Sequence, residues 1–120
     1  MTAKTRKAQA KPWTNKLDQD VVQEALEEAC VDAYGEDEQH TGLLTLIGDE
    51  LQFPFDARVM GQTIQVVDMK WPENDTYGLD LVCEIDGEEH CIEARSVELL
   101  PPFPEGHQFL AAYLDWRRRL

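Results

Sequence analysis

The segment from Leu17 to Leu51 carries eleven carboxylates and no lysine or arginine. Leucine and valine recur in it at helical spacing, so we expect it to fold rather than to remain a solvated tail. Folding so many like charges together costs free energy through self-repulsion. A divalent cation with oxygen ligands is the simplest way to offset that cost. The residue types therefore point to a calcium site, with Mg²⁺ as the competing ion.

The positions of these acids on the expected helices decide which of them need an explanation. Four lie on one face of the first helix, where like charges at this spacing are destabilising: Asp20, Glu24, Glu28 and Asp32. A solvated face is the alternative explanation for this row. Asp32 also lies near the end of that helix, and Asp49 and Glu50 lie at the end of the second, where the helix dipole disfavours negative charge. Residues 36–38 are acids that begin the second helix, where the dipole alone accounts for them.

No standard calcium loop or catalytic motif accompanies the acids. With Gly78 at position 6 of an EF-hand loop, a tyrosine falls on position 5 and strands are expected on both sides, so we reject that motif. Asp75, in the same loop, stays an isolated candidate ligand. The three histidines and three cysteines lack zinc spacing, and no nucleophile elbow or phosphate-binding loop occurs. The sequence therefore does not indicate an enzyme.

Charge divides the chain in two. Residues 1–16 contain five basic residues and no acid, whereas residues 17–120 contain six basic residues and all 24 acids, a net charge of −18. Such a body repels nucleic acid phosphates and anionic membranes, and it favours cations or a basic protein partner. No apolar run is long enough to span a membrane, and no signal-peptide segment is recognisable. The odd count of three cysteines favours reduced thiols and a cytoplasmic location.

The apolar pattern predicts one domain over residues 17–120, preceded by a disordered basic arm over residues 1–16. We expect a first helix from Leu17 or Asp18 to about Ala33, a break at Gly35, and a second helix from about Glu36 to Leu51. About five short strands follow between residues 57 and 99, and an apolar face predicts a last helix over residues 109–119. The fold class is therefore α+β: two N-terminal helices, a small antiparallel SH3-like sheet or barrel, and a C-terminal helix.

The dipeptide Asp86-Gly87 is a strong hairpin signal within the strand region. With a two-residue turn, Cys83 lies opposite His90 and Cys91 lies opposite Val82. With a one-residue bulge, Cys83 lies opposite Cys91 instead. Core packing is the default role for these cysteines in either register.

Two runs in the first half of the chain carry a family resemblance. They are Val31-Asp32-Ala33-Tyr34-Gly35-Glu36-Asp37-Glu38-Gln39 and Phe53-Pro54-Phe55-Asp56-Ala57. Both resemble the bacterial calcium-binding family typified by the cyanobacterial protein CcbP, and the tail Ala111-Ala112-Tyr113-Leu114-Asp115-Trp116 is similar to that family's C-terminal helix. The resemblance covers roughly residues 17–120. It implies two N-terminal helices before a compact sheet, and Ca²⁺ bound by acidic side chains to buffer or sense cytosolic calcium.

The resemblance makes the four acids inside the first run candidate ligands, and helix-end position adds two more. The full set of candidate metal ligands is Asp32, Glu36, Asp37, Glu38, Asp49 and Glu50. We therefore expect a soluble calcium-binding protein that acts as a buffer or weak sensor. The alternative is a metal-independent interaction module whose acidic helices bind a basic protein partner.

Overall fold

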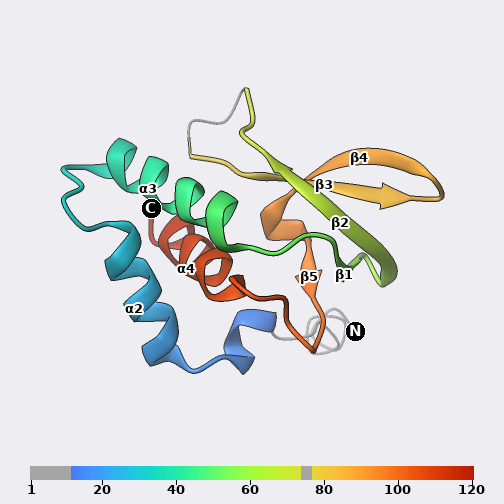
Figure 1. Ribbon diagram of the computed structural model, residues 1–120, viewed down its shortest axis with the longest axis horizontal. Helices are drawn as coiled ribbons and strands as arrows, with labels where there is room; N and C mark the ends of the chain where they lie inside the picture. Colours follow the sequence, from blue (N-terminus) through green and yellow to red (C-terminus); the bar gives the residue numbers. More distant parts are fainter. Residues whose placement is uncertain (1–11, 74–76) are drawn as a thin grey trace, which may run out of the picture.

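The computed structural model describes residues 12–73 and 77–120. Within these ranges, three α-helices form one side of the molecule and a five-stranded antiparallel sheet forms the other (Figure 1). The elements in chain order are η1 (Trp13–Lys16), α2 (Gln19–Ala29), α3 (Glu36–Glu50), β1 (Phe55–Val59), β2 (Gln62–Lys70), β3 (Asp80–Ile85), β4 (Glu88–Glu93), η2 (Ala94–Ser96), β5 (Glu98–Leu99) and α4 (His107–Arg118). The predicted α+β class, with two N-terminal helices and one C-terminal helix, is confirmed.

The C-terminal helix α4 is the centre of the helical layer, since it lies between α2 and α3 and contacts both (Figure 1). Its side chains are buried from Phe109 to Tyr113 and again at Trp116. Apolar residues three or four apart on α2 and α3 enter the same core: Val22, Ala25, Ala29, Leu43, Leu44 and Ile47. No helix in the described part of the chain is long and apolar enough to cross a membrane.

The helix α2 is shorter than its periodicity predicts, since it ends at Ala29 rather than near residue 33. Asp18 defines its start as the N-cap, because its side chain accepts a hydrogen bond from the Asp20 backbone N–H (2.9 Å). Its last residue packs against α3 at Gly42, where a Cβ atom would lie 2.2 Å from the Ala29 carbonyl oxygen. The two backbones therefore approach closely at the last residue of the helix, and the chain then turns toward α3.

The sheet has the strand order β4-β3-β2-β1-β5, so β4 and β5 are its two edges. Of the two predicted forms, sheet or barrel, the structure has the open sheet, because the two-residue strand β5 pairs with β1 and does not reach β4. The two-residue hairpin turn is confirmed, with Cys83 opposite His90 and Val82 opposite Cys91. The irregularity in the sheet lies instead in β2, between Val66 and Asp68.

The predicted basic arm falls mostly on residues 1–11, which lie outside the described residues. For its last residues the prediction of disorder is wrong. Trp13–Lys16 form the 3-10 helix η1, and Trp13 is only 3% exposed, beside Phe103 with ring centroids 5.6 Å apart. A single tryptophan without periodic neighbours gives no local sign of burial, because its partner lies 90 residues away in the chain.

Candidate metal centre

Four of the predicted ligands lie in the turn between α2 and α3 or in the first turn of α3. After α2 the chain reverses through a turn in which the Ala33 backbone N–H donates to the Cys30 carbonyl oxygen (3.0 Å). Asp32 has a φ of 61°, in the left-handed region that aspartate tolerates better than most residues. Gly35, with a φ of 109°, then serves as the N-cap of α3 in a conformation that favours glycine. Asp32 therefore lies in the turn that leads into α3, four residues before Glu36.

The three acids at residues 36–38 form the first turn of α3 and are exposed, as is the aspartate before them. Two of the three are oriented by hydrogen bonds. Glu38 Oε1 accepts from the Tyr34 backbone N–H (3.0 Å), and Asp37 Oδ1 accepts from the Tyr77 hydroxyl (2.6 Å). Both donors are neutral, so these bonds hold the carboxylates without cancelling their charge.

The hydrogen bond from Tyr77 ties the acidic turn to the rest of the fold. It raises the pKa of Tyr77 to about 12, chiefly because the phenol donates to Asp37, with desolvation and the charge of Asp37 adding to the shift. The Tyr77 carbonyl oxygen accepts from the Tyr113 hydroxyl (2.8 Å), and the Gly78 carbonyl oxygen lies 2.8 Å from His40 Nε2. The segment that leads into β3 is therefore attached to both α3 and α4 beside Asp37.

A cluster of aromatic rings supports α3 behind the acids. His40 is 6% exposed, and four rings surround it with centroids 5.6 to 6.3 Å from its own: Trp71, Tyr77, Tyr113 and Trp116. The Trp116 indole N–H also donates to Gln39 Oε1 (2.8 Å). The first turns of α3 therefore rest on packed side chains on one side while their carboxylates face solvent on the other.

Asp49 and Glu50 do not join the acidic turn. They are exposed at the C-terminal end of α3, and Asp49 lies twelve residues after Asp37, or about 18 Å along the helix axis at 1.5 Å per residue. A Ca²⁺ ion contacts its ligands at about 2.3–2.6 Å, so one ion cannot bind both ends of the helix. Neither residue forms an ion pair with any other described residue. The six predicted ligands thus fall in two separate segments, four between residues 32 and 38 and two at the end of α3.

No three His, Cys, Asp or Glu side chains within residues 12–73 and 77–120 already lie close enough to hold a metal ion. The isolated candidate Asp75 lies outside the described residues. Sequence reasoning missed the role of Tyr77, because its bond to Asp37 spans 40 residues and leaves no local pattern. The donors available at the turn are carboxylate oxygens, which suit Ca²⁺ or Mg²⁺ and do not suit a soft metal.

Known proteins support this assignment of the ion. A family model described as calcium binding, CcbP, matches residues 23–116, a range that includes all six predicted ligands. The crystal structure of Anabaena CcbP has a similar fold, with a TM-score of 0.67 and 18% identity over 84% of this chain and 91% of that chain. No curated protein matches the chain. Because the family match covers more than three quarters of the sequence, this chain belongs to the CcbP family of calcium-binding proteins.

Proposed function

We propose that the protein binds Ca²⁺ at the α2–α3 turn through Asp32, Glu36, Asp37 and Glu38, as a calcium buffer or weak sensor. The observation that carries this proposal is how the exposed carboxylates are held. Their hydrogen bonds come from neutral donors, and no lysine or arginine lies between residues 17 and 51. The turn therefore keeps its full negative charge, which a divalent cation would neutralise.

The turn supplies enough oxygen atoms for most of a calcium shell. Ca²⁺ takes about six to eight oxygen ligands, and each carboxylate offers two. Asp37 and Glu38 each use one oxygen in the hydrogen bond that orients it, and the second oxygen stays available. Water completes the shell at an exposed turn, so we expect an affinity toward the weak end of the range of calcium sensors, roughly 10⁻⁵ M.

Asp49 and Glu50 belong to a different place on the surface. At about 18 Å from Asp37 along α3, they are too far away to share its ion. We assign this pair at most a second, independent calcium site of lower affinity. Two sets of titrating residues at opposite ends of α3 would distinguish this arrangement from a single site.

A titration of the metal-free protein with Ca²⁺, followed by NMR and by the melting temperature, tests the proposal. We expect shifts centred on residues 30–38 and on Tyr77, and a larger rise in melting temperature with Ca²⁺ than with Mg²⁺ at equal concentration. NaCl at matched ionic strength controls for screening. Equal stabilisation by all three salts would contradict a specific site and would favour the alternative, a metal-independent interaction module.

The same titration separates a buffer from a sensor. The Tyr77 hydroxyl donates a hydrogen bond to Asp37, and the Tyr77 carbonyl oxygen accepts one from Tyr113. A displacement of Asp37 would therefore be transmitted through Tyr77 to α4. For a sensor we expect shifts along α4 at the same calcium concentration as those in the turn. For a buffer we expect the shifts to stop at Tyr77.

A further inference from the structure

A cavity of about 380 Å³ lies where η1, the start of α2, the η2–β5 segment and the C-terminal half of α4 meet. Its volume falls within the range of pockets that hold small organic ligands, roughly 300–1,000 Å³. None of the six candidate metal ligands is among the described residues that line it. The cavity is therefore separate from the acidic turn.

The cavity is apolar at its base and charged at its rim. Trp13, Val22, Val97 and Ala111 line it, and each is at most 4% exposed. The side chain of Arg118, which also lines it, is 67% exposed. A buried apolar surface beside a polar group at the opening suits a ligand with an apolar body and a charged head.

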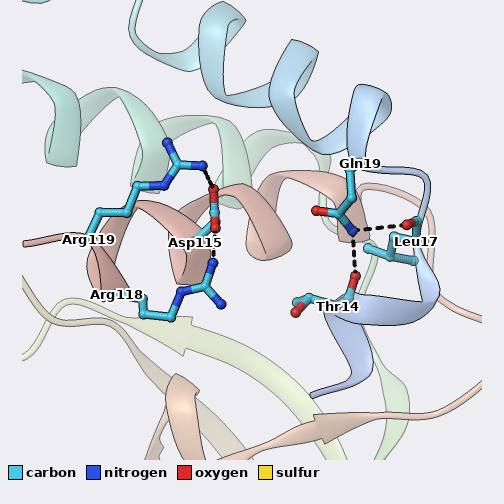
Figure 2. A network of polar contacts seen from close by, with 6 residues as sticks. All are labelled: Thr14, Leu17, Gln19, Asp115, Arg118 and Arg119. Atoms are coloured by element: carbon cyan, nitrogen blue, oxygen red, sulfur yellow. Dashed lines mark hydrogen bonds and ion pairs between the residues drawn. The ribbon is translucent and has the colours of Figure 1, made fainter. Parts of the chain in front are cut away.

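Arginines lie at this rim although the protein is acidic. The charged residues that line the cavity are two arginines, Arg95 and Arg118, and two acids, Glu98 and Asp115. Asp115 lines the cavity and is bonded to both Arg118 and Arg119, so one carboxylate faces two guanidinium groups (Figure 2). The Asp115 side chain is 16% exposed, far less than that of Arg118. Of this pair, the group that a ligand meets first at the opening is therefore the guanidinium of Arg118.

The other charged residues of the wall, Glu98 and Arg95, each lie beside a residue of opposite charge. Glu98 is 28% exposed and lies 3.9 Å from Arg58, so a cation is already close to it. The cavity is lined by Arg95 and Arg118, and its two acids also contact Arg58 and Arg119. The helix dipole accounts for arginines at the end of α4. Arg95 of η2 opens onto the same space and is paired with Glu93.

We propose that this cavity binds a small organic acid, with its apolar body against Trp13 and Val22 and its carboxylate on Arg118. The bond from Arg118 to Asp115 runs through one terminal nitrogen, and a guanidinium has five N–H donors, so donors remain for a bidentate carboxylate. Gln19 holds the wall in shape, because its side-chain amide donates to the carbonyl oxygens of Thr14 (3.1 Å) and Leu17 (3.0 Å), as Figure 2 shows.

Octanoate is the probe. Octanamide is its neutral analogue, and butyrate has the same carboxylate but four fewer methylene groups. In about 0.15 M salt, which limits long-range repulsion, we expect octanoate to shift the NMR signals of the Trp13 indole N–H, Val97 and Leu114. Octanamide should bind about tenfold more weakly, because it lacks the charge-assisted pair with arginine. Butyrate should bind more weakly still, since each buried methylene contributes about fourfold in affinity.

Arg118→Gln and Arg119→Gln are matched variants for this test. Both arginines bond to Asp115 and have similar exposure, 67% and 60%, but only Arg118 lines the cavity. We expect Arg118→Gln to lower the octanoate affinity about tenfold and Arg119→Gln to lower it less than about twofold, with calcium binding unchanged in both. Equal losses in the two variants would overturn the proposal. So would octanamide binding as tightly as octanoate, or octanoate shifts that leave Trp13 unaffected.

Discussion

Replacing Asp32 by asparagine is the sharpest test of the acidic turn. Asp32 is exposed and has a φ of 61°, a region in which asparagine is at least as well tolerated as aspartate. The two side chains have nearly the same shape, so Asp32→Asn preserves the turn and removes one negative charge. The substitution should therefore act in opposite directions on the metal-free and the calcium-bound protein.

The expected magnitudes follow from the exposure of the turn. Without calcium, Asp32 adds to the like charge of the acids at residues 36–38, and exposed charge pairs contribute about 0–1 kcal/mol, so its removal stabilises the metal-free protein by up to about 1 kcal/mol. Calcium at 100 times its Kd stabilises the wild-type protein by about 2.7 kcal/mol. If the variant binds about tenfold more weakly, the same calcium concentration stabilises it by only about 1.4 kcal/mol. The variant is then more stable than wild type in chelator and less stable in calcium.

Urea unfolding in chelator and in CaCl₂, together with calorimetric titration of Ca²⁺, measures both effects. Asp86→Asn is the matched control, because Asp86 is also exposed and also has a left-handed backbone, with a φ of 53°. It lies at the tip of the β3–β4 hairpin, at the opposite end of a molecule 45 Å long (Figure 1). We expect Asp86→Asn to leave the calcium affinity unchanged.

Two results would refute this reasoning. An unchanged calcium affinity in Asp32→Asn would remove Asp32 from the metal site. Equal losses of affinity in Asp32→Asn and Asp86→Asn would show that calcium responds to the net charge of the whole protein, which is −13, and not to a local group of ligands.

Three further predictions concern the bond to Asp37, the N-terminal segment and the thiols. The pKa of Tyr77 is about 12 against an ordinary 10, so its proton contributes stability that is complete below pH 10 and is lost as the pH rises toward 12. Tyr77→Phe should make the free energy of unfolding less dependent on pH between about pH 10 and 12. An unchanged dependence on pH would argue against the hydrogen bond. Trp13→Ala should lower the free energy of unfolding in urea by about 3–5 kcal/mol, whereas a change near zero would return Trp13 to a disordered arm. A thiol reagent at pH 8 should modify exposed Cys91 in the native protein but Cys83 only on unfolding, since Cys83 is buried and burial raises its pKa to about 11. Equal rates for the two thiols would contradict the register of the β3–β4 hairpin.

Local patterns predict much of the fold because they depend on neighbours in the sequence. The second helix is expected from about Glu36 to Leu51 and is observed over Glu36–Glu50, since acids suit its N-terminus and the Phe-Pro pair disfavours helix beyond its end. The Asp-Gly pair predicts the β3–β4 hairpin in the same way, but it leaves two registers open, and the structure has the one with a two-residue turn. The end of α2 is not predicted by such local patterns, because it lies where Ala29 packs against Gly42 of another helix.

The candidate site was likewise predicted in part from local sequence patterns and decided in part by the tertiary structure. The sequence identifies the acids and shows which of them lie at helix ends, but it treats Asp32 and Asp49 alike as acids that the helix dipole disfavours. In the structure, Asp32 lies in the turn before α3, and the length of α3 separates that turn from Asp49. The donor that orients Asp37 comes from Tyr77, 40 residues away.

The sequence by itself determined the acidic character of the body, the α+β class, most element boundaries and the resemblance to a calcium-binding family. These properties are carried by composition and by spacings of two to four residues, which act within a single helix, strand or turn. The tertiary structure alone decided the open edge of the sheet, the burial of Trp13, the bond between Tyr77 and Asp37, and the arginine-rimmed cavity. Each of these depends on how separate elements pack, and residue spacing within one element does not encode the position of another.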